Sequence, residues 1–332
     1  MLRSLQVLAI AAALAAPWPV ASAELRFHRI GTGEPSSTAF AVGTAVAAAI
    51  SRPPGALDCE RGGSCGVPGL VAVALSTAGS VANVNAVAER QLDSAFVQSD
   101  IATWAANGVE IFRGRPKRTE IRAIAGLFPE YVHLVARKGA GIDGIVGLRG
   151  KRVAVDVAGS GTLVVAGLIF QHFGLPERSL TALKLAPGPA ADMLANDEID
   201  ALFFVGGVPA PLLDIMIGQV PFDIVPISGR GIDRLTHQHR FLSAATIPAG
   251  VYEGYGEIPT IGVGTQWIVH ASADEETVYQ ITKALWHPAN RRTIEARSTA
   301  VSMARPDLAL AGLTVPLHAG AERYYREAGL RQ

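Results

Sequence analysis

The chain has 332 residues, 49% of them hydrophobic and 17% charged, and its 29 basic residues balance its 29 acidic ones. This is a globular composition, and it excludes a disordered chain, which needs few apolar residues and a large net charge. Zero net charge without a basic stripe also excludes nucleic acid as a partner, and at roughly 100–200 residues per domain the length indicates one large domain or two ordinary ones.

The first 23 residues have the pattern of a secretory signal peptide. Arg3 gives a positive start, an apolar run covers 5–16, and the small residues at 21–23 are those that a signal peptidase reads. We therefore expect cleavage after Ala23 and a periplasmic mature protein. A membrane anchor is the alternative, but the apolar run is shorter than the ~20 residues that a spanning helix needs.

The mature chain begins with repeated units of strand, loop and helix. Strands are expected at 25–30, 70–75 and 94–98, and helices at 39–50, 81–89 and 101–106. Apolar runs or alternation mark the strands, and residues that favour turns separate them from the helices. This order is typical of α/β units.

The second half of the chain repeats this order. Strands are expected at 131–136, 150–155, 199–205, 260–264 and 267–270, and helices at 163–173, 189–196 and 275–285. The repeated units predict an α/β fold with mainly parallel sheets. Ligands of such sheets bind outside the carboxyl ends of the strands, so the loops at these ends are the candidate site.

Cys59 and Cys65 are the only cysteines. In an oxidising compartment they are expected to form a disulfide across their short Gly-rich loop. A metal site is the alternative, but two thiols with no nearby histidine fall short of the four ligands of a structural zinc site.

Three loops carry polar groups of the kind that bind small anions. The Gly-Ser-Gly-Thr stretch at 159–162 lies at a helix start, where free backbone N–H groups and two hydroxyls can hold an anion, or where a hydroxyl merely caps the helix. Ser80 carries the same ambiguity. The segment 98–100 places an amide, a hydroxyl and a carboxylate at a strand end, with Asp100 expected as a helix cap.

Catalytic signatures are weak. The sequence around Ser64 matches G-x-S-x-G, but the buried strand and the helix that should flank a nucleophile elbow are missing, and the expected disulfide encloses the serine. A secreted serine hydrolase that uses Ser64 remains the alternative function. The segment 31–33 is half of a dinucleotide fingerprint, with Ser36 in place of its third glycine. His237 and His239 lack a third metal ligand close by and are expected to be an exposed pair.

Ten short segments occur in a characteristic order and spacing. They lie at 31–33, 59–70, 79–83, 98–100, 127–133, 148–153, 159–162, 199–209, 246–252 and 316–329. In this order they resemble the TAXI branch of the TRAP-transporter substrate-binding proteins over nearly the whole mature chain, and the cysteine-containing segment resembles that of one subgroup.

The resemblance implies a type II periplasmic-binding-protein fold, in which two α/β lobes enclose a ligand cleft and are joined by crossing strands. One crossing is expected near 131–134 and the return within 245–265. Lobe I would then comprise 24–133 and 262–332, and lobe II 134–261. The implied protein is a monomer without enzymatic activity, cofactor or metal. It would deliver a small organic anion, a carboxylate or an amino acid, to a membrane-embedded TRAP permease.

The resemblance also implies a set of ligand-binding residues. From lobe I they are Gly33, Ser36, Ser37, Thr38, Ser80, Gln98 and Ser99, and from lobe II Ser160, Gly161, Thr162, Gly207 and Pro209. The first loop departs from the family pattern Gly-Thr-Tyr-Tyr-Pro-Leu-Gly, because Ala39 and Phe40 replace the two tyrosines. The pocket is therefore expected to be wider or less polar. A ligand sensor for a membrane signalling protein would need the same lobe closure and stays open as an alternative.

Overall fold

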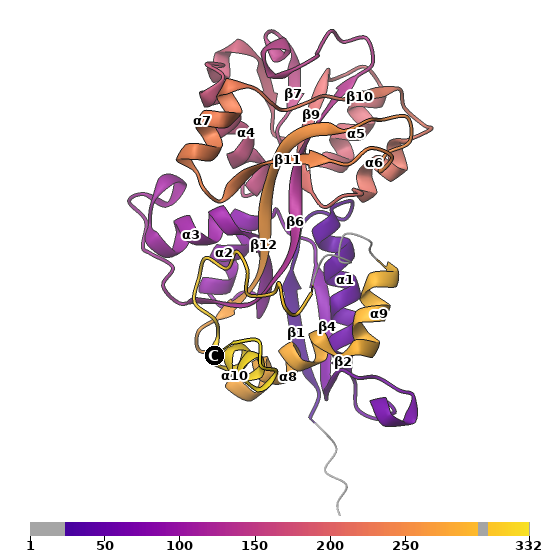
Figure 1. The fold of residues 1–332 in the computed structure, drawn as a ribbon, viewed down its shortest axis with the longest axis vertical. Helices are drawn as coiled ribbons and strands as arrows, with labels where there is room; N and C mark the ends of the chain where they lie inside the picture. The colour runs from indigo at the N-terminus through magenta and orange to yellow at the C-terminus, as the bar shows by residue number, and fades with distance from the viewer. Residues whose placement is uncertain (1–23, 298–304, 332) are drawn as a thin grey trace, which may run out of the picture.

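The computed structural model describes residues 24–297 and 305–331, so the signal peptide predicted at 1–23 lies outside the described residues. Two lobes are stacked along the long axis of the molecule, and two long strands run through both of them (Figure 1). Among the described residues, no helix has both the length and the apolar character that crossing a bilayer requires.

One ten-stranded sheet extends through both lobes in the order β4-β1-β5-β12-β6-β9-β7-β8, with β10 paired to β6 and β11 to β12. Its strands are β1 (Arg26–Gly31), β4 (Leu70–Leu75), β5 (Ser94–Gln98), β6 (Ile121–Arg137), β7 (Arg152–Ala154), β8 (Thr181–Leu183), β9 (Ala201–Gly206), β10 (Phe222–Ile224), β11 (Leu242–Ile247) and β12 (Ile258–His270). A separate pair is formed by β2 (Ser51–Arg52) and β3 (Val67–Pro68).

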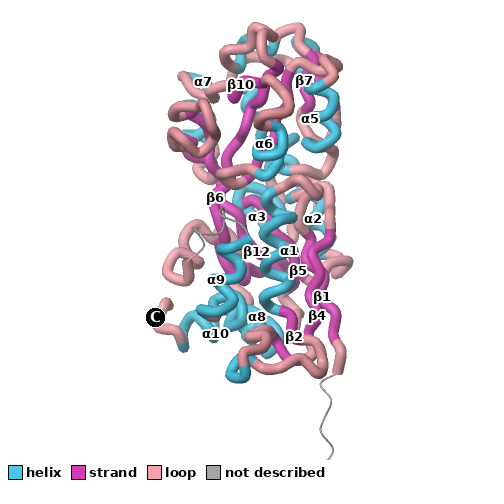
Figure 2. The backbone as a smooth tube through the Cα atoms, turned by 90° about the vertical axis from the view of Figure 1, so that its right-hand side faces the viewer, coloured by secondary structure: helices cyan, strands magenta, loops and turns pink. Residues whose placement is uncertain are grey.

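The helices pack on this sheet (Figure 2). They are α1 (Thr38–Ile50), α2 (Ser80–Ala88), α3 (Ser99–Asn107), α4 (Gly161–His172), α5 (Pro187–Ala195), α6 (Pro211–Met216), α7 (Arg230–Gln238), α8 (Glu275–Trp286), α9 (Pro288–Arg297) and α10 (Ala319–Glu327). Short 3₁₀ turns occur at η1 (Cys59–Arg61), η2 (Glu110–Phe112), η3 (Ile145–Leu148) and η4 (Glu177–Ser179).

The predicted α/β fold is confirmed, but the sheet is mixed rather than mainly parallel. The outer pairs β1–β4 and β7–β8 are parallel, as βαβ units require. The crossing strands β6 and β12 run antiparallel to each other and to their neighbours β5 and β9. The central pair is antiparallel because β6 carries the chain into the upper lobe and β12 brings it back.

Each crossing strand is longer than its sequence pattern indicated. The structure has one strand β12 where two were predicted at 260–264 and 267–270, and the polar gap between them coincides with a register shift between Gly264 and Gln266. The strand predicted at 131–136 is the second half of β6, which begins at Ile121. The predicted lobe limits at 133/134 and 261/262 fall inside these two strands and stay a prediction.

Each lobe has its own apolar core. In lobe I, α1 and α8 bury a cluster against the sheet in which Trp267 meets Phe96 edge-to-face, with ring centroids 5.9 Å apart. In lobe II, two clusters lie on opposite faces of the sheet, one around Phe203 and the other around Phe204. A further cluster of lobe I includes Trp104, and Val164 and Leu168 of α4 pack against it, so the lobes also touch through apolar side chains.

The predicted disulfide between Cys59 and Cys65 is present. Contrary to the expectation that no histidine lies nearby, His287 Nε2 is 3.7 Å from Cys59 Sγ. Both sulfurs are consumed by the disulfide, so they offer no thiolate to a metal. Ser64 lies in the same loop, where its Oγ donates a hydrogen bond to the Ser51 carbonyl at 2.6 Å and accepts one from the Gly66 N–H at 3.0 Å. The serine therefore fastens the loop to the end of α1.

Removing the disulfide should destabilise the protein without changing its fold. By the loop-entropy estimate for so short a loop, the double substitution Cys59→Ser and Cys65→Ser should lower the free energy of unfolding by about 2 kcal/mol. Urea unfolding followed by circular dichroism measures this change. Reduction of the native protein should give the same shift, and an unchanged urea midpoint in both cases would contradict the structural role of this link.

Candidate functional site

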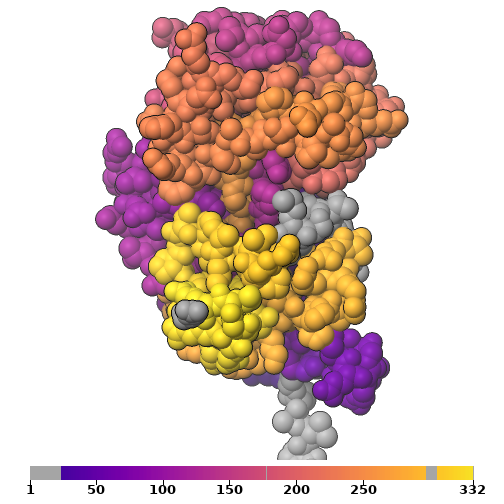
Figure 3. Space-filling view, in the orientation of Figure 1, coloured from indigo at the N-terminus to yellow at the C-terminus, as the bar shows by residue number. Residues whose placement is uncertain are grey.

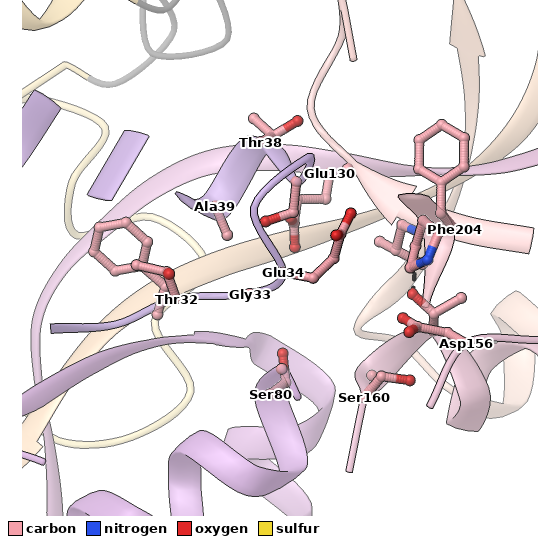
Figure 4. Close-up of a pocket in the computed structure, with 18 of the residues that line it drawn as sticks. Thr32, Gly33, Glu34, Thr38, Ala39, Ser80, Glu130, Asp156, Ser160 and Phe204 are labelled. Atoms are coloured by element: carbon pink, nitrogen blue, oxygen red, sulfur yellow. Dashed lines mark hydrogen bonds between the residues drawn. The ribbon is translucent and has the colours of Figure 1, made fainter. Parts of the chain in front are cut away.

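A cavity lies between the lobes, where the N-terminal ends of α1, α2, α4, α5 and α6 meet (Figure 4). Figure 3 shows the two lobes as separate masses joined at a narrow region where β6 and β12 are visible. The space open to the centre of a water molecule is about 70 Å³. One water needs roughly 10–15 Å³ on that measure, so the cavity holds only a small molecule.

The lobe I wall of the cavity is built around the start of α1. Ser37 caps this helix, since its Oγ accepts a hydrogen bond from the Phe40 N–H at 3.1 Å. The N–H groups of Thr38 and Ala39, in the first turn, make no hydrogen bond to another described residue. They are orphan donors of a helix start, and they lie beside the cavity.

The lobe II wall repeats this arrangement at the start of α4. Ser160 caps the helix through a hydrogen bond of 3.0 Å from the Leu163 N–H, and Thr162 Oγ1 accepts from the Val205 N–H at 3.1 Å. Among the described residues, the N–H groups of Gly161 and Thr162 have no acceptor. The loop can therefore cap the helix and bind an anion at the same time, because Ser160 caps α4 while the N–H groups of the next two residues stay free.

Hydrogen bonds join the two walls directly. The N–H groups of Val81 and Ala82 in α2 donate to the Gly159 carbonyl of the opposite lobe, each at 3.0 Å. The Gly207 N–H of lobe II donates to Thr38 Oγ1 of lobe I, also at 3.0 Å. The first residue before α2, Gly79, provides no side-chain cap, so the other lobe caps this helix. The structure is thus a closed arrangement of the lobes.

Phe204 forms an apolar part of the cavity wall, and His133 packs against its ring. Its ring stacks on His133 with centroids 4.4 Å apart. His133 donates from Nδ1 to the Tyr131 carbonyl at 2.9 Å and accepts at Nε2 from the Tyr252 hydroxyl at 3.0 Å. Burial lowers the pKa of His133 to about 4, so the ring stays neutral and the polar groups behind Phe204 are satisfied.

All charged side chains that line the cavity are acidic. They are Glu34, Glu130 and Asp156, and no lysine, arginine or histidine is among the described lining residues. Burial raises the pKa of Glu130 to about 7, which the neighbouring Thr265 and Gln98 side chains partly offset. Burial likewise raises the pKa of Asp156 to about 6. The cavity therefore combines positive helix ends with two buried carboxyl groups, those of Glu130 and Asp156, whose pKa values are raised.

A second layer of polar atoms lies next to Glu130. Asp100 is fully buried, which raises its pKa to about 7, and its charge in turn raises the pKa of Glu130. Gln98 Oε1, Thr265 Oγ1 and Asp100 Oδ2 are buried and have no hydrogen-bond partner among the described residues. Such orphaned acceptors are uncommon in folded proteins.

Most of the residues expected at the site do line the cavity. These are Gly33, Ser36, Ser37, Thr38, Ser80, Gln98, Ser160, Gly161 and Thr162. Ala39 lies there as well, whereas Phe40 does not.

Three expected residues do not line the cavity. The Ser99 hydroxyl faces away, 3.5 Å from the Gly312 carbonyl, because it follows Gln98 at the turn from β5 into α3. Gly207 uses its N–H to bind Thr38. Pro209 is not part of the lining, whereas Gly206 and Ala210 are.

The acidic residues Glu34, Glu130 and Asp156 line the cavity but were not among the residues expected from the sequence. For Asp156 a signal exists in the sequence, since a carboxylate directly follows the apolar strand segment 153–155. The expected exposed pair of histidines is also corrected. His237 is exposed, but His239 is buried beneath the Trp104 ring of the other lobe, with centroids 5.8 Å apart.

Comparisons with known proteins matched one family model and several solved structures. A family model described as the NMT1-like family matches residues 30–329. MatC from Rhodopseudomonas palustris, solved with bound malate, is 15% identical with a TM-score of 0.53, and the match covers 94% of this chain and 98% of that one. A protein from Bordetella bronchiseptica RB50 is 13% identical with a TM-score of 0.53, covering 91% and 98%. The alkanesulfonate-binding protein SsuA from Xanthomonas axonopodis pv. citri, bound to MOPS, is 17% identical with a TM-score of 0.44, covering 94% and 86%.

Gly161 permits the close approach of the lobes and offers a test of the closed arrangement. A Cβ atom at this position would lie 1.8 Å from Gln98 Oε1, whereas one at Gly167 of the same helix would meet nothing within 4 Å. Gly161→Ala should therefore hinder closure, because the buried amide group of Gln98 that the added methyl group meets must first be displaced. The Val81 and Ala82 amides should then lose their protection from hydrogen exchange, by about tenfold or more, because they no longer reach Gly159.

Gly167→Ala is the matched control, since it adds the same methyl group to α4. It should leave both amides as protected as in the native protein. Equal protection of these amides in all three proteins would contradict the assignment of the two hydrogen bonds as contacts that form on closure.

Proposed function

Since the chain belongs to the NMT1-like family, we propose that it is a periplasmic solute-binding receptor that captures a small organic anion, a carboxylate or an amino acid, by lobe closure. The signal peptide predicted at 1–23 would be removed on export. The order of the loop segments, which resembles the TAXI branch, supports a monomer that delivers its solute to a TRAP permease.

One observation carries the anion assignment. Helix α1 of lobe I and helix α4 of lobe II both present unpaired N–H groups to the same cavity. A helix N-terminus carries roughly half a positive charge, and its free N–H groups are donors for a carboxylate. A buried donor without an acceptor costs about 1–3 kcal/mol. An anion that spans both helix starts would relieve this cost in both lobes at once.

Closure follows from the same geometry. A ligand shifts an equilibrium between open and closed lobes only as far as it binds one state more tightly. A solute that touches α1 and α4 makes both sets of contacts only when the lobes approach, so it favours the closed form. The direct contacts between Gly159 and α2, and between Gly207 and Thr38, then add to the ligand's own hydrogen bonds.

The dimensions of the cavity support a small solute. Its volume of about 70 Å³ leaves no room for a peptide or a sugar polymer. MatC, which shares the fold, was solved with malate, a four-carbon acid. The loss of both family tyrosines at Ala39 and Phe40 removes two hydroxyls that a relative could use, so the solute need not be that of any relative.

A thermal-shift screen of small carboxylic acids and amino acids tests the proposal. A ligand that binds only the folded state at a hundredfold excess over its Kd should stabilise that state by about 2.7 kcal/mol. At least one acid of up to about six carbons should raise the melting temperature in this way. Stabilisation by sugars or polyamines, with none by any acid, would contradict an anion receptor.

The helix caps supply a paired test of the binding residues. Ser160→Ala removes the cap of α4 beside the cavity, and Asp274→Ala removes the cap of α8 outside it. Each should cost about 1 kcal/mol of stability. Only Ser160→Ala should also weaken binding of the acid found in the screen, by about fivefold or more, which calorimetry measures.

Gln98→Ala should weaken binding of the same acid because Gln98 lines the cavity from lobe I. If neither Ser160→Ala nor Gln98→Ala changes the affinity, the solute binds elsewhere. If Asp274→Ala weakens binding as much as Ser160→Ala, the effect reflects general destabilisation and the assignment of Ser160 is wrong.

A further inference from the structure

The charged side chains inside the cavity do not complement a solute whose only charged groups are carboxylates. Three carboxyl groups line the cavity, and no cationic side chain does so among the described residues. Figure 4 shows Glu34, Glu130 and Asp156 around the same space. Burial is the main cause of the raised pKa of Asp156, and the charge of Glu34 adds to it. A solute that is only an anion would enter a space already crowded with acidic groups.

An orphaned acceptor lies beside Glu130 in the lining. Gln98 Oε1 has no hydrogen-bond partner among the described residues, and Gln98 is 4% exposed. A protonated amine offers three N–H donors and one positive charge. It would satisfy an acceptor that a carboxylate leaves unpaired, and burying it against an ionised carboxylate avoids the cost of an unpaired charge.

From this arrangement we infer that the solute carries a protonated amine as well as a carboxylate. Glu130 and Asp156 receive the amine, and the starts of α1 and α4 receive the carboxylate. The inference rests on the proposed function and narrows its substrate class to a small zwitterion, as opposed to a dicarboxylic or hydroxy acid.

A metal ion would be another way to neutralise the carboxyls, but the geometry disfavours it. Within the described part of the chain, Cys59, Cys65 and His287 are the only three side chains of metal-binding type whose ligand atoms lie within 4.8 Å of one another. The carboxyl groups of the cavity do not bring three ligand atoms this close together. An ammonium group does not require three ligand atoms around it.

The direction in which the binding affinity changes with pH distinguishes a solute with an amine from a simple anion. The groups that face Glu130 are Gln98, Thr265 and Asp100. Those that face Asp156 are Glu34, Ser160 and Thr162. None of these groups is cationic. An ammonium favours the ionised carboxylates, so its binding releases protons and its affinity should rise as the pH increases from about 6 to 8. A dianion favours the protonated carboxyls, so its affinity should fall over the same window.

Calorimetry on matched pairs of solutes tests the inference with the intact mature protein. Suitable pairs are glutamate and glutarate, aspartate and malate, and alanine and propionate, each at pH 6, 7 and 8. We expect the amine-bearing member of the best-binding pair to bind at least about tenfold more tightly at pH 8, equal to about 1.4 kcal/mol, with proton release and with affinity that rises with pH.

The possible results separate the inference from the proposed function. If a diacid or hydroxy acid binds as tightly as its amine-bearing partner, or if the affinity of the amine-bearing partner falls as the pH rises, the inference is wrong while the anion receptor stands. If no member of any pair binds and no other acid does so in the screen, both are wrong.

Neutral isosteres identify the residues that receive the amine. Glu130→Gln and Asp156→Asn each remove one titratable group with almost no change of shape. At pH 8 each should weaken binding of the zwitterion by about tenfold and flatten its pH dependence, and neither should weaken binding of the deaminated partner. Equal losses for both members of the pair would overturn the assignment.

Asp214→Asn in α6 is the control, because this carboxyl also has a raised pKa but does not line the cavity. It should leave the affinity and the pH dependence for the zwitterion unchanged. Circular dichroism and the melting temperature of each variant at pH 6 establish that the folds are comparable. A change of pH dependence in Asp214→Asn as large as in Glu130→Gln would also contradict the inference.

Discussion

The two hydrogen bonds that the Gly159 carbonyl accepts from α2 join helix capping to lobe closure. Every helix must satisfy its first N–H groups, and α2 follows a glycine that offers no side chain for this purpose. Its partner is a backbone carbonyl that belongs to the other lobe and immediately precedes Ser160. The same loop therefore caps α2 through its carbonyl and presents the free amides of α4 to the cavity, so closure and the completion of the binding site are one event.

Much of this arrangement was predictable because it depends on local sequence. Apolar runs located β1, β4 and β5, and helix-start loops located most of the residues around the cavity. Features that depend on distant partners were missed. The first half of β6 contains Gly126 and Pro129, which usually interrupt a strand. Pro129 is tolerated because it lies opposite Gly264, next to the register shift in β12.

The acidic character of the cavity escaped the pattern analysis for a similar reason. A lone Glu130 or Asp156 in a sequence is normally a solvated surface group. Only the packing of the lobes buries these carboxyls and raises the pKa of each, and no cationic side chain lines the cavity beside them in the described part of the chain. Likewise, the contact of His239 with Trp104 joins elements more than 130 positions apart, which no local pattern reports.

The antiparallel pairing of β6 and β12 has a mechanical consequence. The chain enters and leaves the upper lobe through two adjacent strands that are hydrogen-bonded to each other. A pair of this kind resists sliding, since sliding would break its ladder, but it can bend and twist as a ribbon. The relative movement of the lobes is therefore restricted to rotation about this ribbon, which returns the walls of the cavity to the same register each time they meet.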